Sequence, residues 1–134
     1  MSAMSTYLEN ALVNHVLRNT AYTTPGTTVY VGLIKYYDAA VVEAGTLTEE
    51  ASGGSYARVQ VTAWDAASNG ATQNTGAITF PTATGDWGGI SGVIISDHAS
   101  AGNVLLHGAL TSERDVKNGD VFKFNAGDLD VTFA

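Results

Sequence analysis

Cysteine is absent from this chain, which excludes disulfides and thiolate metal sites. Charge is also scarce, because 14% of the residues are charged where roughly a quarter is usual. Six basic residues against 13 acidic ones give a net charge of -7, which makes the chain a poor candidate for binding nucleic-acid phosphates. No apolar run approaches the roughly 20 residues that span a bilayer, and the N-terminus lacks a secretory signal pattern. We therefore expect no nucleic acid and no membrane among the partners.

The motifs of common catalytic sites are missing as well. Ser, His and Asp all occur, but no Gly-x-Ser-x-Gly nucleophile elbow does. The glycines at positions 88, 89 and 92 lack the following helix and the Lys of a phosphate-binding loop. We expect a protein that is not an enzyme and that uses no cofactor.

What is present is a chain of 134 residues, 45% of them apolar, which is enough for one core. We expect a single domain over residues 1–134. Low charge together with 15 glycines and many Thr, Ser and Ala residues suggests that partners cover much of the surface.

Residues 5–19 have the pattern of an amphipathic helix. Thr6 and Glu9 have the spacing of a capping box, which satisfies two backbone donors at a helix start. The apolar arc is broader than a helix resting on one sheet needs. We expect one side to pack on the body and the other on a neighbouring subunit, with three interface residues spaced one turn apart: Leu8, Leu12 and Val16.

Most of the chain from about 27 to 133 alternates between short apolar strands and Gly, Asn or Asp turns. This predicts a mainly β fold: an antiparallel β-sandwich or jelly-roll-like barrel of about seven to eight strands with one N-terminal α-helix. Asn118-Gly119 predicts a hairpin between residues 114–116 and 120–124.

Residues 35–54 predict a long, mobile, acidic loop. A loop of this length is a second candidate for an inter-subunit contact. The residues expected to take part are Tyr36, Tyr37 and Glu43.

The stretch from Phe80 to Ile95 predicts a strand, a corner and a second strand. Pro81 ends the first strand because it cannot donate a ladder hydrogen bond. Trp87 beside Gly88 places an indole over backbone that carries no side chain. We expect these three residues to be structural, although Asp86 with Trp87 could instead contact a sugar.

Candidate metal ligands are few. Asp120, Asp128 and Asp130 are a weak candidate calcium site, because clustered carboxylates can supply oxygen ligands, yet their spacing matches no EF-hand loop. Asp97 and His98 could form a ligand pair, which is too few for zinc. We expect no metal site.

We expect two further histidines to be structural. His15 falls in the apolar arc of the helix and should be buried or at an interface. His107 lies within an apolar strand and should have a hydrogen-bond partner.

Several segments together resemble a family of small bacteriophage virion proteins, described as tail fibre or capsid decoration proteins. The resemblance spans nearly the whole chain, and its most specific segments are Gly53-Gly-Ser-Tyr-Ala-Arg58 and Phe80-Pro-Thr-Ala-Thr-Gly-Asp-Trp-Gly88. Residues 35–51 are longer than the family pattern, and residues 89–96 hold smaller side chains. The resemblance implies a structural protein of the virion and no catalytic residues.

Within that resemblance we favour a capsid decoration (cement) protein that binds the major capsid protein and further copies of itself, as a homo-oligomer. A fibre subunit would be expected to continue into a long shaft, which the residues after Phe124 do not provide. A tail or tail-fibre accessory protein is the alternative. From another class, a carbohydrate-binding module would need an exposed row of aromatics such as Tyr36, Tyr37 and Trp64.

Overall fold

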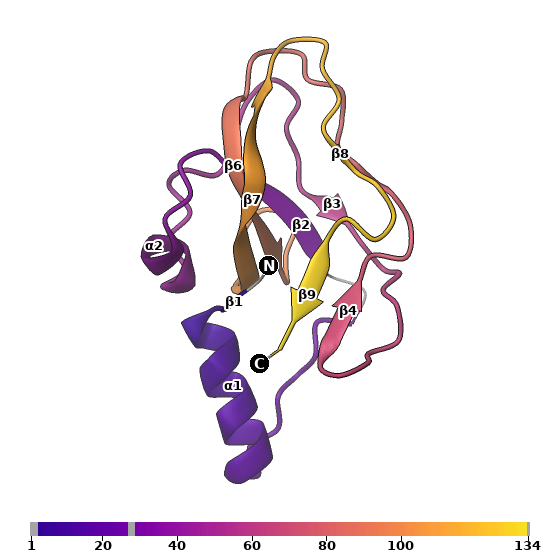
Figure 1. Cartoon of the computed structure of the whole chain (residues 1–134). Coiled ribbons are helices and arrows are strands. Elements are labelled where there is room, and N and C mark those ends of the chain that lie inside the picture. The colour runs from indigo at the N-terminus through magenta and orange to yellow at the C-terminus, as the bar shows by residue number, and fades with distance from the viewer. Residues whose placement is uncertain (1–2, 27–28, 134) are drawn as a thin grey trace.

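A computed structural model describes residues 3–26 and 29–133, and these form two β layers with a helix at one end (Figure 1). The first layer is a five-stranded antiparallel sheet in the order β1-β7-β6-β2-β3. Its strands are β1 (Ala3–Met4), β7 (Val104–Val116), β6 (Gly88–Ser96), β2 (Tyr30–Ile34) and β3 (Val59–Gln60).

Two small antiparallel sheets make the second layer. One pairs β4 (Ala71–Gln73) with β9 (Asp130–Thr132), and the other pairs β5 (Ile78–Thr79) with β8 (Lys123–Phe124). The predicted mainly β, antiparallel fold with one N-terminal helix is confirmed, and the described residues form no closed barrel. The predicted strand start at 27–28 lies outside the described residues.

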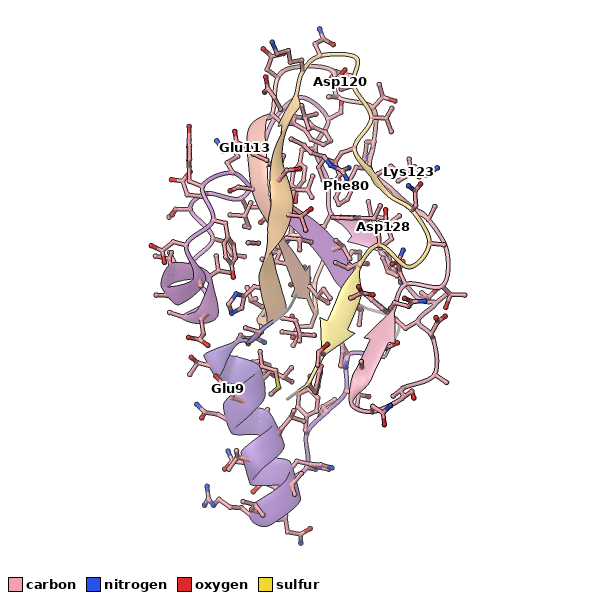
Figure 2. The ribbon with its side chains drawn as sticks, in the orientation of Figure 1. Glu9, Phe80, Glu113, Asp120, Lys123 and Asp128 are labelled. Atoms are coloured by element: carbon pink, nitrogen blue, oxygen red, sulfur yellow. The ribbon has the colours of Figure 1, made fainter. Side chains whose placement is uncertain are left out.

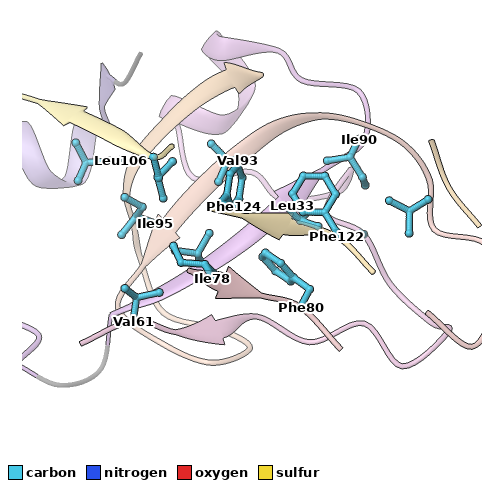
Figure 3. Close-up of a cluster of buried hydrophobic side chains, with 14 of the residues drawn as sticks. Leu33, Val61, Ile78, Phe80, Ile90, Val93, Ile95, Leu106, Phe122 and Phe124 are labelled. Carbon is cyan, nitrogen blue, oxygen red and sulfur yellow. The ribbon is translucent and has the colours of Figure 1, made fainter. Parts of the chain in front are cut away.

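The core lies between the layers (Figure 3). Phe80, Phe122 and Phe124 meet at its centre with ring centroids 5.2 to 6.4 Å apart and tilted edge to face. The first layer contributes Leu33, Val93, Ile95 and Leu106. Because burial of such a side chain contributes about 1.5–3 kcal/mol, this cluster is the main source of stability.

The predicted hairpin around Asn118-Gly119 is wrong. The turn exists, because Asp120 N donates to Lys117 O at 2.9 Å, but β8 pairs with β5 and not with β7. The Phe80 cluster explains this, since residues 122–124 must lie beside β5 for their rings to meet.

The prediction that residues 35–54 form a loop without secondary structure is also wrong, because they contain a short helix, α2 (Ala39–Glu43). Asp38 caps α2 by accepting from Ala40 N at 3.0 Å. Val42 is buried against β6 and β7 in a small second core with Ile34, Ile94 and Val104.

The N-terminal helix α1 (Thr6–Leu17) begins one residue later and ends two residues earlier than predicted. Ser5, and not Thr6, is its cap: the Ser5 hydroxyl oxygen accepts from Leu8 N at 3.2 Å and its hydroxyl donates to Val104 O. Asn19 ends the helix in a left-handed conformation with φ 54°. In the described part of the chain, neither helix is long and apolar enough to cross a membrane.

Candidate interaction surface

The Trp87 corner is closed and offers no sugar platform. The Trp87 indole is 3% exposed, and its Nε1 donates to Gly54 O at 2.9 Å. The Tyr56 ring meets it edge to face with centroids 5.3 Å apart. Asp86 accepts from Asn118 N at 2.9 Å, so the carboxylate supports a turn. The suggested sugar contact at Asp86 and Trp87 therefore has no exposed indole face.

The two segments that carried the resemblance meet in this corner. Gly54 has φ +52° and Ser55 φ +65°, and a Cβ on Gly54 would lie 2.8 Å from Gly85 O. Thr84 N donates to Gly54 O at 2.9 Å, while the Ser55 and Thr84 hydroxyls lie 2.8 Å apart. We call Gly54, Ser55, Thr84, Gly85 and Trp87 the glycine corner. Gly88, with φ +88°, follows it and begins β6, and Pro81 is exposed after β5.

Arg58 joins Glu50 to the end of β6 and to the loop that follows β6. Its Nε and Nη2 donate to the two carboxylate oxygens of Glu50, each at 2.8 Å, and this pairing raises the pKa of Arg58. Its Nη1 donates to Ser96 Oγ, His98 O and Ala101 O at 2.8 to 3.1 Å. The guanidinium is buried and each of its three nitrogens donates to a group of the chain, so Arg58 holds the fold.

Sequence reasoning missed this ion pair. In the sequence Arg58 alternates with apolar residues, in line with Gln60 and Thr62, which is typical of an outward-facing strand residue, whereas the structure buries it. Tyr56 shares the pair, because its hydroxyl donates to Glu50 at 2.8 Å; burial, then the nearby carboxylate, raises the pKa of Tyr56. An arginine eight residues after a glutamate was the available signal, and it is too common to single out a pair.

Asn74 is a second structural residue that the sequence did not reveal. It is 1% exposed, and its side chain bonds to Gly76 O, Asn125 O and Leu129 N at 2.7 to 3.0 Å. Asn74 lies between β4 and β5, so these bonds hold the chain where it passes from one small sheet to the other.

The carboxylates proposed for calcium lie apart. Asp120 and Asp128 each accept from a backbone N–H three residues earlier, at 2.9 Å, and Figure 2 shows them at different heights of the same segment. Asp130 belongs to β9, opposite Gln73. Within residues 3–26 and 29–133 no three His, Asp or Glu side chains form a group that could hold a metal ion.

Two of the histidines serve backbone groups. His98 Nδ1 accepts from Ser100 N and Ala101 N, each at 3.1 Å, which shapes the loop after β6. His15 is exposed in the monomer, so of the two expected positions the interface one stays a prediction; its Nδ1 accepts from Tyr22 N at 3.2 Å. Asp97 accepts from Asn103 N at 2.6 Å, so Asp97 and His98 do not act as a ligand pair.

His107 is the buried histidine, and it has the partner that we expected. The Tyr37 hydroxyl and His107 Nδ1 lie 2.7 Å apart. Tyr37 can reach the ring because it lies over Gly92, where a side chain would clash. Tyr36 points the opposite way and is 76% exposed, and Trp64 is half-buried. These aromatics do not form the row that a carbohydrate-binding module needs.

A hollow of about 450 Å³ is lined by residues of the paired strands β4 and β9 and of the segment before them. Its most polar wall residue, Asp65, already accepts from the Thr75 hydroxyl at 2.7 Å and from Gln73 Nε2 at 3.0 Å. These two bonds, in that order, lower the pKa of Asp65. The Asp65 carboxylate is therefore already bonded within the chain.

Helix α1 is the contrasting surface. The three predicted interface residues become more exposed from the start of the helix to its end. Leu8 is 4% exposed, Leu12 packs partly against the core and Val16 is 72% exposed. Val13 and Leu17 are exposed beside Val16, at 53% and 78%. Figure 1 shows the reason, because α1 starts at β1 and extends past the end of the sheet. We call Val13, Val16 and Leu17 the α1 tip.

Glu43, the remaining candidate interface residue, ends α2 on the side of the sheet away from β9 (Figure 1). Tyr36 and Val41 are exposed near it, whereas Tyr37 is turned inward. Leu8 also belongs to the body of this monomer and is not an open interface residue.

The structure thus combines a packed β body with a helix whose last turns expose apolar side chains. The chain belongs to the Podophage GP4 fiber I protein gp80 family, whose model matches residues 3–132. The suspected membership in a family of small phage virion proteins is thereby confirmed. None of the curated proteins matches the chain.

Proposed function

We propose that this chain is a non-enzymatic structural subunit of a phage fibre. The observation that carries the proposal is the match to a podophage fibre family over residues 3–132, which covers nearly all of the chain. A packed core and exposed apolar side chains on α1 support the proposal, because a virion component needs a stable body and a surface for assembly.

The chemistry of the body supports a structural role. Arg58, Glu50, Asp65 and Asp97 bond to groups of the chain itself. A catalytic site needs titratable groups that converge on a space for substrate. In the part of the chain that the structure describes, these groups hold loops in place and do not converge in that way.

A capsid decoration protein, bound to the major capsid protein, is the competing role. A compact β body with an exposed helix would suit the shell as well. The two roles differ in position and in copy number, because a shell carries hundreds of decoration proteins and a tail carries a few to a few dozen fibre subunits.

The test is to label purified particles with antibody and gold against this chain, and to count its copies by quantitative mass spectrometry. We expect label on the tail fibres and a low copy number relative to the major capsid protein. Label over the whole shell with copies in the hundreds would overturn the fibre role and establish decoration.

A further inference from the structure

A hollow of about 260 Å³ is lined by residues of β7 and by residues from the end of β8 to the position before β9. Its apolar side chains are buried or half-buried: Leu110, Phe124 and Leu129. Its polar side chains are exposed: Thr111, Ser112, Arg114 and Asp128. Covered apolar groups combined with a few accessible polar groups are typical of small-molecule sites. We call this the β7 hollow.

Arg114 is the only cation in the wall of the β7 hollow, and the chain holds it in place. Its guanidinium carbon lies 4.9 Å from the centroid of the Phe122 ring, and its Nη1 donates to Lys123 O at 3.1 Å. Within residues 3–26 and 29–133 no carboxylate pairs with it, and its Nε and Nη2 donate to no group of the chain. The guanidinium is therefore positioned but has two donors left for a ligand.

Those two donors are the pair that a carboxylate accepts. Nε and Nη2 form a rigid fork that matches the two oxygens of a carboxylate. The chain contains one example, because the Nε and Nη2 of Arg58 donate to the two oxygens of Glu50, each at 2.8 Å. Arg58 already has its carboxylate, whereas Arg114 has none among the described residues. The β7 hollow can therefore bind a carboxylate in the same geometry.

The rest of the wall limits what else the ligand carries. Asp128 Oδ2 accepts from Asn125 N at 2.9 Å, and its other carboxylate oxygen accepts from no described group. This carboxylate and the net charge of -7 disfavour a doubly charged anion such as phosphate. They favour a ligand with one negative charge that donates hydrogen bonds from hydroxyl groups. The hydroxyls of Thr111 and Ser112 can donate to such groups or accept from them.

We propose that the β7 hollow binds a uronic acid, a sugar that carries one carboxylate and several hydroxyl groups. The carboxylate lies on the Arg114 fork, and a sugar hydroxyl donates to Asp128. The hollow has several times the roughly 30 Å³ that one water takes in the liquid, so it has room for more than an ion. Because it is open and has few polar partners, a single sugar binds weakly, at about millimolar concentration. This goes beyond the proposed fibre role, because it is a property of the isolated chain.

NMR titration of the isotope-labelled full chain with glucuronate tests this. Glucose, which lacks the carboxylate, and inorganic phosphate, which lacks the hydroxyl-bearing ring, are titrated in parallel at constant ionic strength. Glucuronate should shift the amides of residues 109–114 and 124–129 in a saturable way. Glucose and phosphate should each bind about tenfold more weakly. Glucuronate without a saturable shift, or phosphate that binds as tightly as glucuronate, would overturn the proposal.

Variants separate the Arg114 fork from general attraction between charges. Arg114→Gln should raise the dissociation constant for glucuronate about tenfold, and Arg114→Lys should also raise it, because a lysine keeps the charge without the fork. Lys123→Gln is the matched control: it removes the same charge nearby, but Lys123 does not line the hollow and its carbonyl is unchanged. Equal losses for Arg114→Gln and Lys123→Gln would overturn the proposal. The spectra report whether each variant folds, and the ligand series on the wild-type chain decides the outcome even if an Arg114 variant does not.

Discussion

The glycine corner and the α1 tip use large apolar side chains in opposite ways. In the glycine corner the Trp87 indole is enclosed, and its one donor is bonded to Gly54. In the α1 tip, Leu17 is exposed and no described residue covers it. The difference teaches that the body encloses its large apolar side chains, whereas the end of α1 leaves them exposed in the monomer. Substitutions in the two regions should therefore differ in kind: folding in one, assembly in the other.

The largest effect is expected below the glycine corner, from Arg58→Met. The change leaves the Glu50 carboxylate without its cation and leaves three acceptors without their donor. The free energy of unfolding should therefore fall by about 3–5 kcal/mol. Urea unfolding followed by fluorescence measures it. Arg18→Met on exposed α1 is the control and should change stability by less than about 0.5 kcal/mol. Equal losses for both would mean that the Arg58 network is not structural.

Trp87→Ala should cost about 3–5 kcal/mol, because a buried indole leaves a cavity in the core. Trp87→Phe should cost less, since a ring remains and Gly54 O keeps its bond from Thr84 N. The unfolding temperatures of the two variants show which of them is less stable. A Trp87→Ala chain as stable as the wild type would reopen the possibility of an exposed, ligand-binding indole.

Gly54→Ala should cost about 2–4 kcal/mol, because it combines a left-handed backbone with a Cβ 2.8 Å from Gly85 O. Gly45→Ala is the matched control: φ is +89°, but nothing lies within 4 Å of its Cβ, so about 1–2 kcal/mol is expected. Chemical denaturation gives the loss of stability for each variant, and the difference between the two losses is the cost of the clash with Gly85. Identical losses would show that the approach of the two backbones is unimportant.

A pH-dependent effect is expected from His107. Its ring is buried, and within the described residues its Nε2 has no partner. Burial lowers the pKa of His107 from 6.5, although Glu43 and then Glu9 act in the opposite direction. The unfolded chain thus binds the proton more readily than the folded one. The neutral ring's contribution to stability is complete above pH 6.5 and is lost as the pH falls through the folded pKa.

Unfolding midpoints measured from neutral to mildly acidic pH test this effect. The wild-type midpoint should fall on acidification, and His107→Gln should flatten the dependence. The difference in slope between the two chains measures the contribution of His107. A His107→Gln chain with the wild-type pH profile would assign the dependence to other groups.

The smallest effect on folding is expected at the α1 tip. It can be compared with a large effect on the same face of the helix, at Leu8. Leu8→Ala should cost about 2–5 kcal/mol, since Leu8 is in the core. Val16→Ala, two turns further on, should change monomer stability by about 0.5 kcal/mol or less. The comparison is made in dilute solution by calorimetry. Similar losses at both sites would place Val16 in the body.

Leu8 and Val16 also show how far the sequence could predict the surface. Periodicity placed both residues on one helical face, but it cannot say where the body beneath that face ends. The burial of the one and the exposure of the other depend on the length of the sheet beside α1. The same limit applies to the hairpin, because Asn118-Gly119 indicates a turn and not which strand β8 joins.

Trp87 and Arg58 show the same contrast in the core. The glycines beside Trp87 predicted a packed indole, since a local pattern was enough. The pairing of Arg58 with Glu50 and with the loop after β6 depends on residues up to 43 positions apart. Alternation places a charged side chain on the outer face by default, so a buried ion pair is invisible to it.

The most direct test of the central claim is hydrogen exchange on α1, in the isolated dilute chain and in assembled particles. If the body is closed and α1 is the assembly surface, the amides of residues 12–17 should exchange much more slowly in the particle. Those of β6 and β7 should exchange alike in both states. Unchanged exchange in α1, with new protection elsewhere on the body, would contradict the account.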